Sequence, residues 1–76
     1  MESLEKAKRG IYYNLVGISD IAPLKLRRRL LELGLTAGQK VRIVRKSLLG
    51  KAYLLEVRGY TLSMRKNLVA FLMVAR

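Results

Sequence analysis

The chain contains no cysteine, no histidine and no tryptophan, and only one proline. Without cysteine, no disulfide supports the fold and no thiolate binds a metal. Without histidine, the chain lacks the commonest metal ligand in proteins and the usual general base near neutral pH. The absence of cysteine also fits a cytoplasmic protein, which is the compartment that we predict.

Acidic residues are scarce as well, with five in 76 residues. No two of them have a spacing that suggests a shared catalytic site, and the serines have no histidine to activate them. The sequence Gly50–Lys51 lacks both the earlier glycine and the following hydroxyl of a phosphate-binding loop. We therefore predict no enzymatic activity and no cofactor, and at most weak divalent metal binding at one carboxylate. Each acid is expected instead to pair with a nearby basic side chain.

Long hydrophobic segments are missing. The longest uncharged runs, "GIYYNLVGIS" and "NLVAFLMVA", have about half of the roughly 20 apolar residues that cross a bilayer. The first ten residues, "MESLEKAKRG", are charged and do not resemble a secretory signal. The sequence therefore predicts that the protein does not span a membrane.

Apolar residues and positive charge are abundant. Apolar residues make up 51% of the chain, which is enough for one compact domain over residues 1–76. Lysine and arginine number 16, and the net charge is +11. This charge suits nucleic acid, an anionic membrane surface or an acidic patch on another protein, and it also suits a solvated surface with no dedicated partner.

The spacing of leucines predicts an amphipathic helix from Leu24 to Leu33. Leu26, Leu30 and Leu33 form its apolar stripe, and we expect Leu24 and Leu31 to flank that stripe. The opposite face is mostly cationic, with Lys25, Arg28, Arg29 and Glu32. Ser19 and Asp20 are capping residue types upstream, and Pro23 suits the first turn. Gly34 is placed to end the helix, and Gly38 to turn the chain into the next strand.

The rest of the chain indicates strands. Alternation of apolar and polar residues predicts strands near residues 10–18, 41–46, 53–58, 60–65 and 71–75. Gly50 suits the hairpin connection between the second and third of these, Gly59 a tight turn or bulge, and Asn67 the cap of a short helical turn. About five short strands in so small a chain favour a mainly β fold, a partly open barrel with one main helix.

These motifs resemble those of a known family. "RLLELGLTAGQKV" is similar to the R-L-x-x-L-G-hydrophobic-x-x-G signature of the FeoA family of ferrous iron uptake. "SLEKAKRGIYYNLVGI" resembles the opening of that family, and "VRGYTLSMRKNLVAFLMV" resembles its closing strand, turn and strand. Two segments depart from the pattern: the hairpin loop "SLLGKAY" lacks prolines, and the turn "KNLV" lacks acids.

The resemblance implies an SH3-like barrel and a regulatory role. It implies that the chain assists FeoB, the membrane transporter with a cytosolic GTPase domain, and is recruited by it to the inner face of the membrane. The signature positions Leu30, Leu33, Gly34, Leu35, Gly38 and, later, Gly59 are expected to be structural.

Six side chains are candidates for partner binding. Lys25, Arg28 and Arg29 lie on the cationic helix face, and Arg29 either binds a partner carboxylate or pairs with Glu32. Leu48 and Leu49 fall at a predicted hairpin tip, and Tyr60 is next to Gly59. These three either anchor a partner or fold onto the core.

Two other functions compete with this interpretation. The first is a nucleic-acid-binding SH3-like module, which the charge favours; against it, Tyr12, Tyr13, Tyr53, Tyr60 and Phe71 mostly fall at expected core positions, leaving no stacking platform. The second is a relative of the SH3-like domain of iron-dependent repressors. An initial methionine and the absence of a DNA-reading helix pair favour a standalone protein. Weak self-association stays open.

Overall fold

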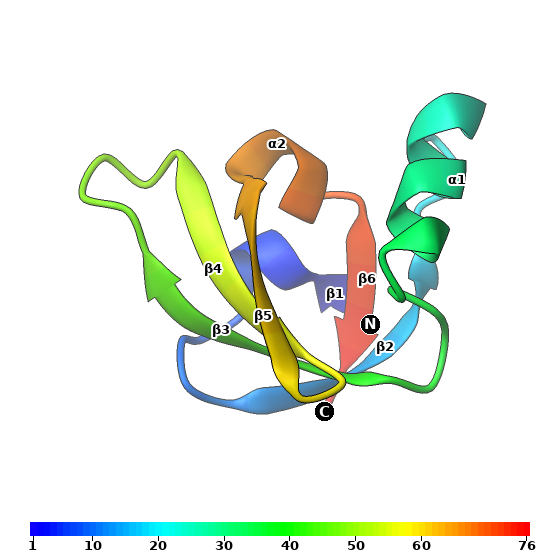
Figure 1. The fold of residues 1–76 in the computed structure, drawn as a ribbon. Coiled ribbons are helices and arrows are strands. Elements are labelled where there is room, and N and C mark those ends of the chain that lie inside the picture. Colours follow the sequence, from blue (N-terminus) through cyan, green and yellow to red (C-terminus); the bar gives the residue numbers. More distant parts are fainter.

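The structure is a computed structural model that describes residues 1–76. Six antiparallel strands form one sheet in the order β1-β6-β2-β3-β4-β5, which curls into a partly open barrel (Figure 1). A helix, α1, stands at one side of the barrel, and a short helix, α2, lies over its open end. The strands are β1 (Glu2–Ser3), β2 (Tyr12–Ile18), β3 (Lys40–Lys46), β4 (Ala52–Val57), β5 (Tyr60–Arg65) and β6 (Leu72–Ala75). The helices are η1 (Leu4–Lys6), α1 (Leu24–Glu32) and α2 (Lys66–Val69).

The alternation predicted from the sequence is present in the central strands. Tyr53, Leu55 and Val57 of β4 are buried, as are Val41 and Ile43 of β3. They belong to one core cluster of 15 residues, contributed by every strand except β1 and by all three helices. The predicted mainly β, partly open barrel is therefore confirmed.

Two β-bulges bend the sheet. The pairing of β2 with β6 shifts between Leu15 and Gly17, and the pairing of β3 with β4 shifts between Ile43 and Arg45. An extra residue in one strand increases the local twist, which curls a sheet toward closure. Val16 and Val44, at the bulges, are turned outward and exposed.

The turn between β4 and β5 has only two residues, Arg58 and Gly59. Both have positive φ angles, +54° and +82°, and Val57 pairs with Tyr60 across the turn. Two positive φ angles in a two-residue hairpin match the right-handed twist of the flanking strands, and glycine adopts one of them without steric cost. The tight turn predicted at Gly59 is confirmed.

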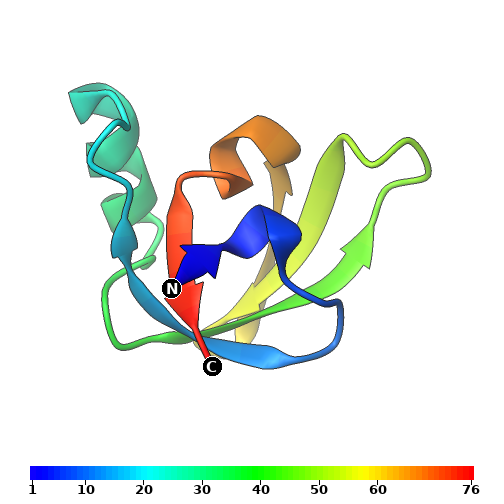
Figure 2. The same ribbon diagram turned by 180° about the vertical axis from the view of Figure 1, so that it is seen from behind.

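The ends of the chain differ from the prediction. The sequence suggested about five strands, whereas β1 adds a sixth, of two residues, that pairs Glu2 with Val74 of β6 (Figure 2). Leu4, in η1, is fully buried. Both depend on contact with the far end of the chain, which no local pattern reports.

The caps of the two helices also differ from the prediction. Pro23, not Ser19 or Asp20, is the N-cap of α1, and no side chain caps it. The Arg27 guanidinium instead donates a hydrogen bond back to the Ser19 carbonyl oxygen at 3.0 Å. In α2 the N-cap is Arg65, so Asn67 lies inside the helix. The backbone N–H of Lys66 donates to the carbonyl of Lys51, the residue before β4, which replaces a side-chain cap.

Candidate partner-binding site

The C-terminal end of α1 is fixed by backbone hydrogen bonds. The N–H of Gly34 donates to the Leu31 carbonyl at 3.0 Å, and the N–H of Leu35 donates to the Leu30 carbonyl at 3.1 Å. This is the Schellman arrangement, and it requires a left-handed residue such as Gly34, whose φ is +89°. Leu30 and Leu35 are buried. The signature at this end of the helix therefore builds the junction between α1 and the barrel.

Tyr60, in β5, holds the same helix end from the other side. Its hydroxyl donates a hydrogen bond to the carbonyl of Leu33. A Cβ atom on Gly34 would lie 3.0 Å from that hydroxyl and 3.3 Å from Cδ of Arg58. Tyr60 was predicted either to anchor a partner or to fold onto the core; the residue is 42% exposed, but its hydroxyl is used within the protein.

A groove of ≈ 290 Å³ lies between α1 on one side and β5 with α2 on the other. It opens next to the seam where the half-buried Leu33 meets the barrel. Two arginines, Arg29 from α1 and Arg65 from β5, also line it. The apolar side chains of the lining are Leu26, Leu30, Leu33, Leu62, Met64 and Leu68. The result is an apolar floor flanked by two guanidinium groups.

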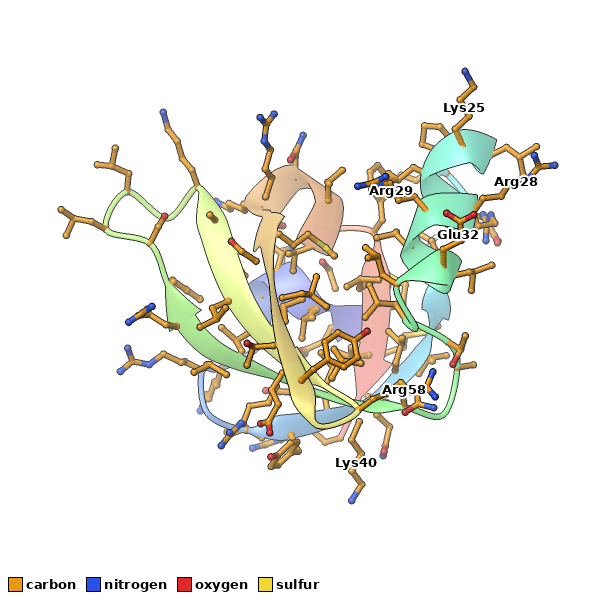
Figure 3. The ribbon with its side chains drawn as sticks, in the orientation of Figure 1. Lys25, Arg28, Arg29, Glu32, Lys40 and Arg58 are labelled. Atoms are coloured by element: carbon orange, nitrogen blue, oxygen red, sulfur yellow. The ribbon has the colours of Figure 1, made fainter.

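Arg29 points in a different direction from the other cations of α1. In Figure 3 it points toward α2, whereas Lys25 and Arg28 point away from the barrel. Residues three and four apart are neighbours on a helix, so Arg29 borders both Lys25 on the cationic face and Leu26 and Leu33 on the apolar stripe. Arg29 therefore lies at the edge of the cationic face nearest α2. Arg29 forms no ion pair, so of its two predicted roles the pairing with Glu32 is not present in the structure.

Leu24 and Leu31 do not flank the buried stripe as expected. They are 61% and 45% exposed. With 3.6 residues per turn, these two positions lie about half a turn from the stripe of Leu26, Leu30 and Leu33. Because that stripe is the apolar side of α1 that packs on the barrel, Leu24 and Leu31 face outward.

The tip of the β3–β4 hairpin carries the other predicted anchors. Leu48 and Leu49 are 101% and 77% exposed, so neither folds onto the core. Figures 1 and 2 show this hairpin and α1 on opposite sides of the barrel. The structure thus divides the predicted site residues between two surfaces.

A cluster of polar side chains, missed by the sequence reasoning, lies on the outer face of β2, β3 and β4. The Tyr12 hydroxyl donates to Oε1 of Glu56 at 2.8 Å, and Nη2 of Arg42 lies 2.5 Å from the same oxygen. The Arg42 guanidinium stacks 4.8 Å from the centre of the Tyr12 ring. Strand pairing, Tyr12 with Arg42 and Arg42 with Glu56, brings them together. The cluster could therefore be predicted only from the register of the strands, which the sequence pattern does not reveal.

This cluster shifts two pKa values. The hydrogen bond from Tyr12, assisted by Arg42, holds the pKa of Glu56 below its ordinary value. The same hydrogen bond raises the pKa of Tyr12. A hollow of ≈ 360 Å³ adjoins the cluster and is also lined by Lys40 and Arg58, labelled in Figure 3. Tyr12 is 49% exposed, which corrects the expectation that the aromatic residues mostly lie in the core.

The acidic residues do not gather into a metal site. No three of them lie close enough together to hold a metal ion. Glu56 pairs with Arg42, and Glu5 lies 3.8 Å from Lys66. The remaining acids form no ion pair, so the prediction that each would find a basic partner is only partly correct.

Three residues of the groove, Leu62, Arg65 and Leu68, were not predicted as functional. The sequence pattern predicts Leu62 as an inward-facing strand residue and Leu68 as part of a helical turn. Their place beside α1 depends on how that helix packs against the side of the barrel. The apolar Leu68 in a short turn was the one local signal that could have suggested it.

The FeoA domain model matches residues 3–76. The chain belongs to the FeoA family. The solved FeoA of Chlorobium tepidum is 30% identical, with a TM-score of 0.85, and the match covers 96% of this chain and 68% of that one. No curated protein sequence matches the chain.

Two further structures show the range of proteins with this fold. FeoA of Stenotrophomonas maltophilia, a procaryotic SH3 domain protein complexed with zinc, is 24% identical with a TM-score of 0.83, covering 97% of this chain and 89% of that one. ScaR with bound Cd²⁺ is 25% identical with a TM-score of 0.85. It matches 100% of this chain over 36% of its own length, so the FeoA fold also occurs as one part of a longer protein.

Solved FeoA proteins include an iron(II) transport protein A from Clostridium thermocellum and an iron uptake regulatory protein. In the present FeoA chain, neither α1 nor α2 has the length and apolar character that crossing a bilayer demands.

Proposed function

We propose that this FeoA chain is a non-enzymatic, cytoplasmic accessory protein of ferrous iron uptake that docks on FeoB. In this proposal it binds the cytosolic GTPase domain of the transporter and biases its nucleotide-driven conformations. The observation that carries the proposal is the apolar groove between α1 and β5–α2, flanked by Arg29 and Arg65. Membership of the FeoA family, whose solved proteins include an iron(II) transport protein A and an iron uptake regulatory protein, supports the choice of partner.

The groove suits a partner segment that presents an apolar side chain next to a carboxylate. A large apolar side chain that leaves water for such a floor contributes about 1.5–3 kcal/mol. An arginine fork binds a carboxylate through two parallel hydrogen bonds, which also fixes the orientation of the segment. Neither Arg29 nor Arg65 has an ion-pair partner within the chain, so both guanidinium groups are available.

Binding of this protein to the isolated GTPase domain at physiological salt tests the proposal. Arg29→Ala should weaken binding about tenfold, which corresponds to about 1.4 kcal/mol. Arg28→Ala is the matched control, because it removes the same charge one residue away, where the side chain points away from the barrel. It should change binding less than about twofold, as expected for a charge outside the interface. Equal effects would show that only net charge matters, and no binding by the wild-type chain would refute the docking.

Nucleic-acid binding is the second candidate, and one observation favours it. The exposed Tyr12 ring lies beside Arg42, Lys40 and Arg58, an arrangement of aromatic and cationic groups on which a base could stack. Glu56 shares the same hollow and repels phosphate. Measuring the binding of a structured RNA in parallel with binding of the GTPase domain separates the two functions. RNA binding that falls steeply with salt and is lost in Tyr12→Ala would favour nucleic-acid binding.

A further inference from the structure

The tip of the β3–β4 hairpin is a closed loop that holds two leucines in solvent. The Ser47 hydroxyl accepts hydrogen bonds from the N–H groups of Lys51 and Ala52, both at 3.1 Å. The N–H of Gly50 donates to the Ser47 carbonyl at 2.8 Å. Leu48 and Leu49 occupy the turn thus closed and are 101% and 77% exposed. Their exposure is therefore built into the loop.

Positive charge surrounds this tip. Arg45 and Lys46 lie on the β3 arm and Lys51 on the β4 arm; all three are exposed, and none forms an ion pair. Residues 40–55 contain no acidic side chain. The tip thus presents two apolar side chains with cations on both arms beside them. This arrangement is complementary to a surface layer that is anionic on its outside and apolar beneath.

A basic hollow lies where the loop at the tip of this hairpin joins β4. It has a volume of ≈ 500 Å³ and is lined by Lys51, Ala52, Arg65, Lys66 and Asn67. Lys51, Arg65 and Lys66 are cationic. The Lys66 ammonium also forms an ion pair with the Glu5 carboxylate, at 3.8 Å. In Figures 1 and 2 the hairpin and α2, which contributes to the hollow, lie toward the same end of the barrel. A surface that meets the tip can therefore also meet the hollow.

We propose that the β3–β4 hairpin binds the surface of an anionic lipid bilayer. Leu48 and Leu49 insert at the boundary between headgroups and acyl chains, and the cations around the tip and hollow contact lipid phosphates. A bilayer fits better than a folded protein, because a narrow convex tip with two leucines needs a soft apolar layer or a matching cavity. The net charge of +11 strengthens the attraction to anionic lipid. The tip lies apart from the α1 groove, and Arg65 lines both the groove and the hollow. This proposal goes beyond docking on FeoB, and variants of the tip alone test it separately.

A tryptophan reporter tests insertion directly, because the chain has no tryptophan of its own. Leu49→Trp and Leu31→Trp place one indole at the tip and one on the exposed side of α1. Vesicles of phosphatidylcholine with phosphatidylglycerol should shift the emission of the first variant to shorter wavelength and leave the second unchanged. Equal shifts, or none in Leu49→Trp, would overturn the proposal.

Sedimentation with the same vesicles measures affinity. The wild-type chain should bind anionic vesicles and not vesicles of phosphatidylcholine alone. The double variant Leu48→Ser/Leu49→Ser should bind roughly tenfold or more weakly, since two large apolar side chains no longer leave water. Leu24→Ser/Leu31→Ser makes the same chemical change on α1 and should bind as the wild type does. Circular dichroism checks that all variants are folded.

Two other outcomes would reject the bilayer as the ligand. If inorganic phosphate displaces the protein fully and the leucine variants bind as the wild type does, the ligand is a phosphate in the hollow. If binding follows net charge alone, so that Lys51→Ala and Arg28→Ala weaken it equally, the hairpin has no special part in it.

Discussion

Replacing Gly34 by alanine tests the junction between α1 and the barrel. Gly34 has a φ of +89°, and an alanine forced into this left-handed region costs about 1–2 kcal/mol. The added Cβ also lies 3.0 Å from the Tyr60 hydroxyl, which is tied to the Leu33 carbonyl. The ring must shift by a few tenths of an ångström to make room, and a hydrogen bond worth about 0.5–1.5 kcal/mol has to adjust with it. We therefore expect Gly34→Ala to destabilise the fold by about 2–3 kcal/mol.

Gly50→Ala is the matched control. Gly50 also has a positive φ, +71°, but a Cβ there meets nothing within 4 Å. It should cost only the conformational penalty of about 1–2 kcal/mol. Urea unfolding followed by circular dichroism measures both variants, with equal m-values as the sign that the denatured state is unchanged. In a domain of this size, 2–3 kcal/mol lowers Tm by roughly 10–20 °C.

The double variant Gly34→Ala/Tyr60→Phe separates the conformational cost of Gly34→Ala from the cost of its contact with Tyr60. Removing the hydroxyl removes both the hydrogen bond to Leu33 and the close contact with the new Cβ. The cost of Gly34→Ala should therefore be smaller in the Tyr60→Phe background, by about 0.5–1 kcal/mol. If Gly34→Ala costs no more than Gly50→Ala, or if its cost is the same in both backgrounds, the contact with Tyr60 does not constrain this position.

Two further predictions concern the core and the polar cluster. Leu30→Ala should cost about 2–5 kcal/mol, because Leu30 is 1% exposed, whereas Leu31→Ala on the outer side should stay within about 0.5 kcal/mol; equal urea midpoints would refute the assignment of the two faces. Tyr12 and Arg42 lower the pKa of Glu56, so its carboxylate stabilises the fold at neutral pH, and this contribution is lost as the pH falls through the lowered pKa. Glu56→Gln should therefore be less stable than the wild type near neutral pH, and the gap should narrow as the pH falls below the ordinary value of 4.5 and close below the lowered pKa; a gap that does not narrow in acid would contradict the linkage.

Much of the fold was predictable because it is encoded locally. A leucine stripe followed by Gly34 predicts a helix and its end, and the Schellman hydrogen bonds confirm both. Alternation around Leu55 predicts a half-buried strand, and Gly59 predicts the tight turn after it. These signals involve residues within a few positions of each other, so backbone geometry and side-chain periodicity are enough to interpret them.

The candidate site was only partly predictable, because its parts come from distant segments. Arg29 was identified as a binding residue, but its neighbours Leu62 and Leu68 were not, since they join it only when α1 packs beside β5 and α2. Leu48 and Leu49 were identified as a pair, but sequence could not decide between a buried and an exposed loop. The hydrogen bonds of Ser47 decide it.

The sequence by itself determined the positive charge, the lack of cysteine and histidine, the order of helix and strands, and the glycines at which the chain turns. Tertiary structure alone decided which face of α1 is covered, that the helix and the hairpin tip lie on opposite sides, and that Tyr12, Arg42 and Glu56 meet. The physical reason is range. Local periodicity fixes which way a side chain leaves its own element, whereas strand register and helix docking fix what it meets there.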